Sequence, residues 1–403
     1  MKIRAIAMVL VLGACTQTPD VPEETPLLER PWSEIEGLAK GSELTWAMWQ
    51  GDPFINAYVS DYLTPELKKR FDITLKTVSA QGNDIVSSLM TELEAGRSAS
   101  AWDMLWINGE TFYQLRQIDA LTGPFTDVLP NSKYIDFDNP FIALDFQQKV
   151  DGYECPWGNV QLALIYDSAR VPEPPRNLDA LEAWVREHPG RFTFDTQFTG
   201  LTFLKSLLIA EAGGGSVLDG PFDEAKYKAA SEKLWARLNR MKPFLWKNGE
   251  SFPNQVSQLH QLFAAGEIDF TMSNNDSEVD NKVVQGTFTD TSRAFVLESG
   301  TIQNTHFIGI AKLSSQPAAA LVAVNFMISP EAQYEKMKPS VWGDTTILDT
   351  QRLPEPWPSK FQSIPERRFS PKRSETSDQA LKEPASEYMI RINKDFRSKV
   401  IEG

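Results

Sequence analysis

The sequence predicts an α/β fold with two successive α/β regions. In the first region, short apolar strands recur about every 30 residues with helical patterns between them, which is typical of parallel βαβ units. Around Cys155, two extended segments interrupt this alternation, and a second α/β region follows them. The 403 residues are enough for a large core and, by length, for two or three domains.

The first 30 residues indicate an export signal followed by a tether. Lys2 and Arg4 precede an apolar run that is far shorter than the roughly 20 residues needed to span a bilayer. The Leu-Gly-Ala-Cys sequence that ends at Cys15 resembles the bacterial lipobox, which implies that Cys15 is lipidated after cleavage. An ordinary signal peptide with an incidental cysteine is the alternative. We therefore expect a signal peptide over residues 1–14 and a lipid-anchored tether over residues 15–30.

The first α/β region carries clear helix boundaries. A helix over residues 32–39 is followed by Gly41, a residue type favoured just beyond a helix end. Asp52 and Pro53 favour a helix start, because aspartate caps the first turn and proline suits the first helical position. The other expected elements are strand 44–48, helix 53–71, strand 73–78, helix 84–95, strand 104–107 and helix 111–118.

The second region begins where extended segments 153–156 and 161–166 meet at Trp157 and Gly158. Ser329 is expected to cap a late helix, with Pro330 at its first position. Expected helices cover residues 177–188, 199–212, 223–241, 254–265 and 317–328, and expected strands cover 191–194, 267–272, 294–298 and 306–311. The proline-rich tail carries one further expected helix, over residues 387–400.

Composition and missing motifs restrict the function. The formal net charge of −14 becomes −16 if Lys2 and Arg4 leave with the signal, and such a surface repels nucleic acid and favours cationic or neutral partners. Lipidation of Cys15 would leave Cys155 as the one remaining cysteine, so we expect no intramolecular disulfide. The sequence has no paired metal-ligand spacing, no nucleophile elbow and no phosphate-binding loop. We therefore expect no metal, no cofactor and no catalytic residues.

Four segments carry a resemblance to a known family. They are the Trp-Ala-Met-Trp run at residues 46–49 with Gly51, the Cys-Pro-Trp-Gly run at 155–158 with residues 161–166, Leu-Phe-Ala-Ala-Gly-Glu-Ile-Asp at 262–269, and Asn-Phe-Met-Ile-Ser-Pro-Glu-Ala-Gln at 325–333. In this order, they resemble the extracellular solute-binding proteins of bacterial ABC importers, which have the type II periplasmic-binding fold. Residues 106–110, 198–200 and 341–344 look closest to the YnjB-like subgroup.

The resemblance implies two α/β lobes, each a mostly parallel sheet flanked by helices, joined by crossing hinge strands around a ligand cleft. Lobe 1 would comprise residues 31–157 and 300–352, lobe 2 residues 158–299, and a C-terminal helical tail, residues 353–403, would pack on the lobes. It also implies a monomer on the periplasmic side of the envelope, with a small-molecule solute, ABC permease subunits of the inner membrane and the membrane itself as partners.

Ligands of open α/β sheets bind outside the carboxyl ends of the strands, so residues at these ends are the candidate site. Trp49 and Trp157 end extended elements and are expected to face the cleft. Asp52 could instead serve only as a helix cap, and the glycines could serve only to permit tight turns. The candidates are Trp49, Gly51, Asp52, Asn108, Glu110, Trp157, Gly158, Thr199, Asn274, Asn275, Asp276 and Asn304.

The candidate residues favour a cationic or neutral organic solute, thiamine-like or polyamine-like, because aromatic faces attract cations and carboxylates pair with them. No arginine or lysine falls at these loop positions, which argues against a bare oxyanion held by basic side chains. Helix N-termini can still bind an anion without them. An anion or another small solute, a periplasmic enzyme and a sensor lipoprotein on the same scaffold remain alternatives.

Overall fold

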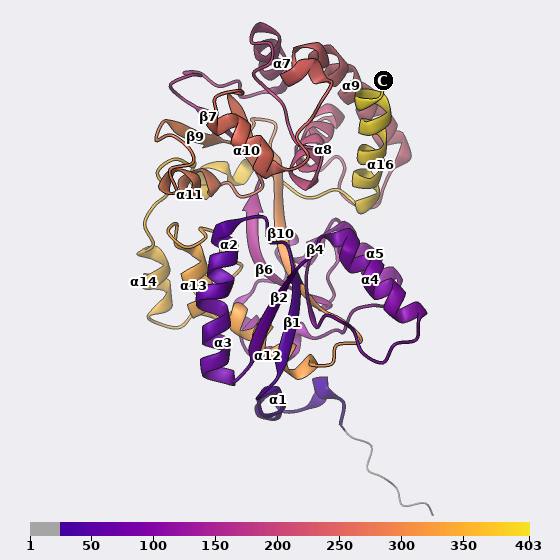
Figure 1. Cartoon of the computed structure of the whole chain (residues 1–403), viewed down its shortest axis with the longest axis vertical. Coiled ribbons are helices and arrows are strands. Elements are labelled where there is room, and N and C mark those ends of the chain that lie inside the picture. Colours follow the sequence, from indigo (N-terminus) through magenta and orange to yellow (C-terminus); the bar gives the residue numbers. More distant parts are fainter. Residues whose placement is uncertain (1–24) are drawn as a thin grey trace, which may run out of the picture.

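The computed structural model describes residues 25–403. Two lobes lie along the longest axis, and strands β6 (Glu154–Gln161) and β10 (Thr301–Ile310) run between them (Figure 1). The first lobe holds the N-terminal strands, and the second lobe holds helices α7 to α11. The expected signal peptide and the Cys15 lipidation site lie outside the described residues. Within residues 25–403, no helix combines the length and the apolar character that crossing a membrane requires.

The first lobe is built on a mostly parallel sheet. β1 (Glu43–Met48) pairs in parallel with β2 (Thr74–Ser79) and with β3 (Met104–Ile107). β10 joins this sheet antiparallel to β3, and the strand order is β11-β10-β3-β1-β2, with β6 paired to β10. The strand–helix alternation expected for this region is confirmed.

The helices predicted for the first lobe begin at, or within two residues of, their expected first residues. Asp52 caps α2 (Pro53–Ala57), and a π-helical turn (Tyr58–Leu63) joins α2 to α3 (Thr64–Phe71), so the expected single helix contains one wide turn. The other helices of this lobe are α1 (Trp32–Ala39), α4 (Gly82–Glu94), α5 (Glu110–Gln117), α6 (Pro140–Ala143), α12 (Pro317–Met327) and α13 (Pro330–Met337).

The two crossing strands are antiparallel partners. Their register runs from Gln303↔Gln161 to Gly309↔Glu154, with one irregularity between His306 and Phe307. Every residue of β6 is buried. Trp157 and Gly158 therefore lie inside one continuous strand and not at a junction between two extended segments.

The second lobe differs from the sequence prediction in its sheet. β7 (Ala163–Asp167) lies between β8 (Phe270–Ser273) and β9 (Ser292–Phe295), and both pairs are antiparallel. The expectation of a mostly parallel sheet is wrong for these three strands, because β7 leaves the first lobe whereas β8 and β9 run back towards it. Segment 191–194, expected as a strand, forms no ladder, although Phe192 and Phe194 are fully buried.

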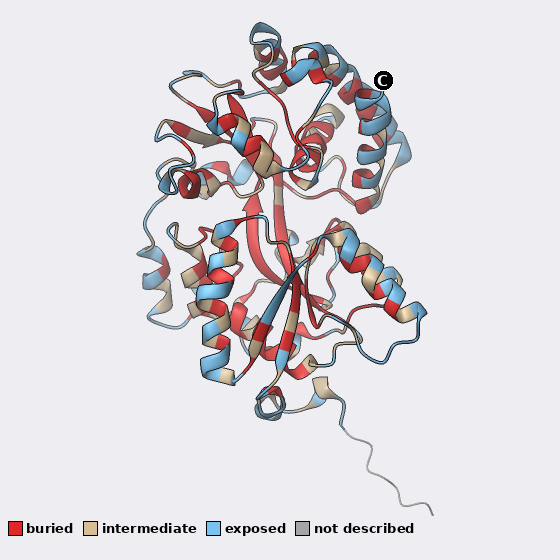
Figure 2. Cartoon of the chain, viewed as in Figure 1, coloured by how far each residue is buried: buried red, intermediate tan, exposed pale blue. Residues whose placement is uncertain are grey.

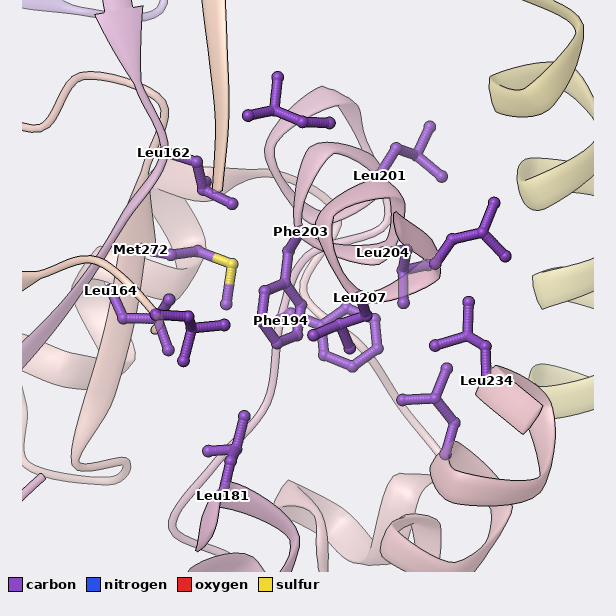
Figure 3. Close-up of a cluster of buried hydrophobic side chains, with 14 of the residues drawn as sticks. Leu162, Leu164, Leu181, Phe194, Leu201, Phe203, Leu204, Leu207, Leu234 and Met272 are labelled. Carbon is purple, nitrogen blue, oxygen red and sulfur yellow. The ribbon is translucent and has the colours of Figure 1, made fainter. Parts of the chain in front are cut away.

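Helix α8 (Phe198–Ala212) is the central helix of the second lobe. Phe203, Leu204 and Leu207 of α8 pack in one cluster with Phe194 and Met272 (Figure 3), and buried residues line the facing sides of the elements in both lobes (Figure 2). A helix that is apolar on all sides is typical of this position. The other helices here are α7 (Leu178–Glu187), α9 (Glu224–Met241), α10 (Val256–Ala264) and α11 (Glu278–Val284).

The C-terminal tail contacts both lobes. α14 (Trp357–Gln362) packs Phe361 into the core of the first lobe. The chain then passes α15 (Arg373–Thr376), adds β11 (Ala380–Leu381) in parallel to β10, and ends with α16 (Ser386–Phe396) against α8. The tail is therefore a third connection between the lobes. The lobe and tail boundaries expected from the sequence stay a prediction.

Candidate ligand-binding site

The first charged contact between the lobes joins α2 to α11. Asp52 Oδ2 lies 3.2 Å from Lys282 Nζ, which is also 3.3 Å from Glu278 Oε1. The other oxygen of Asp52 accepts hydrogen bonds from the backbone N–H groups of Phe54 and Ile55, at 2.8 and 3.1 Å. Asp52 therefore caps its helix and faces the second lobe at the same time.

Burial and neighbouring charges set the protonation of this contact. Burial raises the pKa of the Asp52 carboxyl, Glu278 adds to this effect, and Lys282 opposes it. Burial alone would lower the pKa of Lys282, but Glu278 and Asp52 outweigh it and the pKa is raised. The Lys282 ammonium consequently stays charged at neutral pH and attracts a carboxylate from each lobe.

A second group of charged side chains surrounds a lysine in the middle of α8. Lys205 is fully buried, and its Nζ lies 2.5 Å from Glu383 Oε2. Glu383 follows β11, and its other oxygen accepts a hydrogen bond from Asn304 Nδ2 at 3.2 Å. Asn304 of the predicted site thus belongs to this group.

Carboxylates outnumber ammonium groups around Lys205. Asp145 accepts a hydrogen bond from the backbone N–H of Gly109, just before α5, and Glu110 is the first residue of that helix. Burial raises the pKa of Glu110, Asp145 and Glu383, and in each case Lys205 opposes the shift. Burial also lowers the pKa of Lys205, which the three carboxylates only partly restore. Burial therefore disfavours the charged form of each of these four groups, and an additional cation would favour the ionised carboxylates.

Two aromatic faces complete the surroundings of the Lys205 ammonium. Nζ lies 4.3 Å from the ring centre of Phe146 and 5.3 Å from that of Phe198, within the range of cation–π attraction. Phe146 is at the tip of a hairpin formed by β4 (Leu144–Asp145) and β5 (Gln148–Lys149), and its φ of 46° is strained for a residue with a side chain. Its ring covers Gly109, where an added Cβ would lie 2.1 Å from a ring carbon.

A small pocket opens beside this group. Asp145, Phe146, Asn304 and Glu383 are among its lining residues, and its volume of about 10 Å³ is close to that of one water molecule. With the lobes in this position, the pocket is too small for an organic solute. A solute can therefore enter here only when the lobes separate.

Three predicted residues lie around the end of β8 in the second lobe. Asn274 Nδ2 donates to Thr199 Oγ1 at 3.1 Å, which links the end of β8 to the start of α8. Asn274 Oδ1 is buried without a partner among the described residues. Asn275 Oδ1 accepts hydrogen bonds from the backbone N–H and the hydroxyl of Ser277, so it shapes the turn before α11.

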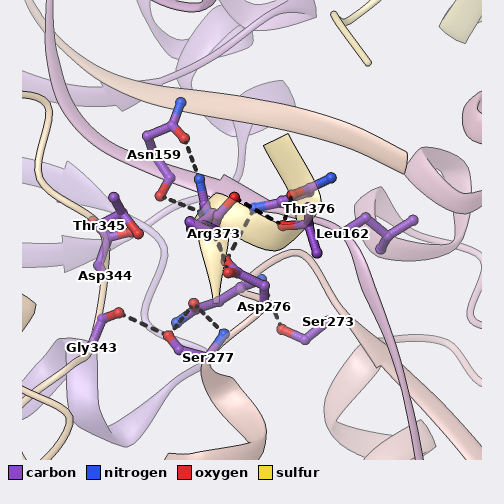
Figure 4. A network of polar contacts seen from close by, with 12 residues as sticks. Asn159, Leu162, Ser273, Asp276, Ser277, Gly343, Asp344, Thr345, Arg373 and Thr376 are labelled. Atoms are coloured by element: carbon purple, nitrogen blue, oxygen red, sulfur yellow. Dashed lines mark hydrogen bonds and ion pairs between the residues drawn. The ribbon is translucent and has the colours of Figure 1, made fainter. Parts of the chain in front are cut away.

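Asp276 does not offer a free carboxylate to a solute. Arg367 and Arg373 of the C-terminal tail bind it at 2.9 and 2.7 Å, and Arg373 also donates to Asn159 Oδ1 at 2.8 Å (Figure 4). The prediction that Asp276 pairs with a cationic ligand is therefore wrong for this conformation. The chain's own guanidinium groups occupy its oxygens.

Trp157 and Gly158 serve packing. Trp157 is fully buried, with its ring centre 5.2, 5.1 and 4.9 Å from those of Trp46, Trp106 and Trp342, so the expectation that it faces the cleft is wrong. A Cβ at Gly158 would lie 2.1 Å from His306 Nε2 and 1.9 Å from Asp344 Oδ2. Glycine is therefore required at position 158 for close packing between these groups.

The remaining predicted residues stay candidates. Trp49 is half-buried after β1, and its ring lies over Gly51, where an added Cβ would be 2.3 Å from it. Asn108 is half-buried, and its carbonyl accepts a hydrogen bond from the backbone N–H of Thr111 at 3.1 Å. Over residues 25–403, no group of three or more His, Cys, Asp or Glu side chains is arranged to hold a metal ion.

Sequence reasoning missed Lys205, Lys282, Asp145 and Glu383. The two lysines lie inside helices, so a search of the strand-end loops for basic residues does not find them. Lys205 had a readable signal: it interrupts the apolar run of residues 201–209, and a buried lysine requires a charged partner. Glu383 had none, because it lies 178 residues from Lys205 in the sequence.

Comparison with known proteins gives a consistent result. Residues 63–362 match the family described as bacterial extracellular solute-binding protein. The chain is 35% identical to Protein YnjB of Escherichia coli K12 over 336 residues, which is 82% of this chain and 86% of that protein.

Solved structures of similar shape share the fold at low sequence identity. AfuA of Actinobacillus pleuropneumoniae, with fructose-6-phosphate bound, has a TM-score of 0.63 and 12% identity, over 89% of this chain and 98% of that chain. The spermidine/putrescine ABC transporter substrate-binding protein PotD of Streptococcus pneumoniae has a TM-score of 0.58 and 14% identity, over 88% and 99%. Apo ferric ion-binding protein A of Pasteurella haemolytica has a TM-score of 0.60 and 14% identity, over 90% and 99%. These similarities confirm the expected type II periplasmic-binding fold.

Proposed function

Because the chain belongs to the bacterial extracellular solute-binding proteins of ABC transporters, we propose that it captures a small cationic organic solute between its lobes and delivers it to a permease in the inner membrane. In this proposal the protein acts as a monomer and is not an enzyme. Polyamine-like and thiamine-like solutes are the classes that we favour.

The observation that carries this proposal is the excess of buried carboxylates around Lys205. Glu110, Asp145 and Glu383 face a single ammonium group, and burial raises the pKa of all three. Ionised carboxylates are costly to bury without partners, so a solute that brings positive charge stabilises the site. The second lobe adds Thr199 and Asn274, whose polar groups suit hydrogen bonding to a solute.

The fold by itself does not select the charge of the solute. PotD is described as a spermidine/putrescine-binding component, whereas AfuA is described with a sugar phosphate. The buried carboxylates of this chain, and not its fold, favour a cation.

A melting-temperature screen tests the proposal. We expect spermidine, putrescine or thiamine to raise the melting temperature, since a ligand that binds only the folded state stabilises it. Glu110→Gln should weaken the effect, because it removes one of the carboxylates. Stabilisation by fructose-6-phosphate or sulfate, with no effect of any of these cations, would contradict the proposal.

An anionic solute is the second candidate, because Lys205 and Lys282 bring two ammonium groups to the lobe interface. The same screen separates the two classes. An anion would gain affinity from the lysines and lose it to the three carboxylates, so we place it second.

We also propose that Cys15 carries a lipid that anchors the protein to a membrane on the periplasmic side of the envelope. Its support is the lipobox-like sequence alone. Acyl labelling should be present in the wild-type protein and absent from Cys15→Ser, which should be released from membranes while still folding. Labelling that persists in Cys15→Ser would contradict the anchor.

A further inference from the structure

The ammonium group of Lys205 has the surroundings that an ammonium ligand requires. It contacts a carboxylate oxygen of Glu383 at 2.5 Å and lies near the faces of Phe146 and Phe198, at 4.3 and 5.3 Å from the ring centres. Carboxylates combined with aromatic faces are an established means of recognising organic cations. A lysine side chain supplies the cation here, and it is fully buried.

We propose that the Lys205 ammonium occupies the ammonium subsite of the solute site, and that a solute cation binds by displacing it. This inference rests on the proposed capture of a cationic solute and adds the residue that competes with it. Lys205 would then set the affinity, because the subsite accepts solute only in the fraction of molecules in which the lysine has left it.

A further carboxylate is buried near Asp145. Glu154 of β6 is fully buried, and neither of its oxygens has a hydrogen-bond partner among residues 25–403. Burial raises its pKa, and the neighbouring Asp145 adds to the rise, while Arg116 opposes it. The small pocket is lined by Asp145, Phe146 and Glu383, three residues that also interact with the Lys205 ammonium. Buried carboxyl groups and a small open space are therefore neighbours here.

The lobe to which each group belongs indicates how a solute cation could replace Lys205 when the lobes open. Lys205 belongs to α8 in the second lobe, and Glu383 lies just after β11, which pairs with the second-lobe end of β10. Asp145 and Phe146 come from the hairpin of the first lobe, whose tip is strained at Phe146. Opening would therefore withdraw Asp145 and Phe146 while Glu383 stays beside Lys205, and a solute cation could then compete for Glu383.

Chemical rescue tests the subsite without knowledge of the natural solute. Lys205→Ala removes a propylammonium-like group, so n-propylammonium at about 10 mM should raise the melting temperature of this variant by filling the vacated subsite. We expect no such rise with 1-propanol, which lacks the charge, and none with n-propylammonium on the wild-type protein. Equal effects of the alcohol and the ammonium, or no effect of either, would overturn the subsite.

Calorimetry on Lys205→Met tests the competition and retains most of the packing if the alanine variant fails to fold. For whichever of spermidine, putrescine or thiamine stabilises the wild-type protein, we expect binding at least about tenfold tighter, since the internal competitor is gone. Lys336→Met is the matched control: Lys336 is also fully buried, pairs with Asp344 and lies near Trp342, but within the first lobe. The affinity of Lys336→Met for the same cation should equal that of the wild-type protein.

Unchanged or weaker binding by Lys205→Met would overturn the inference, because Lys205 would then be inert or in direct contact with the solute. If no cation binds the wild-type protein, the proposed function fails. The propylammonium experiment still reports on the subsite in that case, so the two failures remain distinguishable.

Discussion

The partners of each buried carboxylate at the lobe interface decide whether it can serve a solute. Asp276 is held by two guanidinium groups, whereas Asp145 accepts a hydrogen bond from the backbone N–H of Gly109 and has no ion pair among the described residues. Both are aspartates in buried positions near strand ends, and the sequence gives no sign of this difference. The arginines that distinguish them are contributed by the C-terminal tail, about 90 residues after Asp276.

We expect Asp276→Ala to destabilise the fold by about 3–5 kcal/mol, because it leaves Arg367 and Arg373 without their shared carboxylate. The midpoint of urea unfolding measures this loss. The exposed Asp127 provides a control, and Asp127→Ala should change stability by less than about 0.5 kcal/mol. A small effect of Asp276→Ala on stability would contradict its structural role.

The pH dependence of the Asp276 contribution has a definite sign. Burial alone would raise the pKa of Asp276, but Arg373 and Arg367 outweigh it and lower the pKa. A lowered pKa contributes stability that is complete above the unfolded value of about 4 and is lost as the pH falls below it. The stability difference between wild type and Asp276→Asn should therefore stay constant near neutral pH and shrink below about pH 4. A difference that instead grows in acid would contradict this assignment.

Gly158→Ala should destabilise the protein by about 1–3 kcal/mol or more, because the added methyl group overlaps His306 and Asp344 in a packed core. Gly37 of α1 is the control, since nothing lies within 4 Å of its added Cβ, and alanine there should stabilise the helix by about 0.5–1 kcal/mol. Thermal unfolding of the two variants compares them directly, and equal behaviour would show that position 158 is not crowded.

At the scale of elements, the first lobe could be predicted and the second lobe only in part. Parallel βαβ units in the first lobe follow from regular strand–helix spacing, and the cap at Asp52 follows from local chemistry alone. The directions of β8 and β9 do not, because apolar runs fix where a strand lies and not which neighbour it pairs with. The contacts at Lys205 and Asp276 could not be predicted for the same reason, because their partners lie far away in the sequence, in the C-terminal tail.

The contact between α2 and α11 should favour the closed position of the lobes. Lys282→Met leaves Asp52 and Glu278 facing each other without the ammonium between them, so we expect the unliganded protein to have a larger radius of gyration in solution scattering. Lys312→Met, which breaks an exposed ion pair with Asp119 within the first lobe, should leave the radius unchanged. Equal radii for wild type and Lys282→Met would show that this contact does not hold the lobes.

The whole molecule combines two lobes, two crossing strands and a tail that contacts both lobes. With the lobes in the described position, the pocket beside Glu383 has about 10 Å³, close to one water molecule, so binding and release of an organic solute at this pocket require the lobes to move apart. A solute shifts the equilibrium towards closed lobes only to the extent that it binds the closed form more tightly than the open form. Capture and lobe closure are therefore one equilibrium in this account.

Solution scattering with and without solute tests that claim most directly. The wild-type protein is measured alone and at a saturating concentration of the cation that raises its melting temperature most. The account predicts a smaller radius of gyration in the presence of the cation and a profile that matches the closed lobes. An unchanged profile at full saturation would contradict capture of the solute between closing lobes.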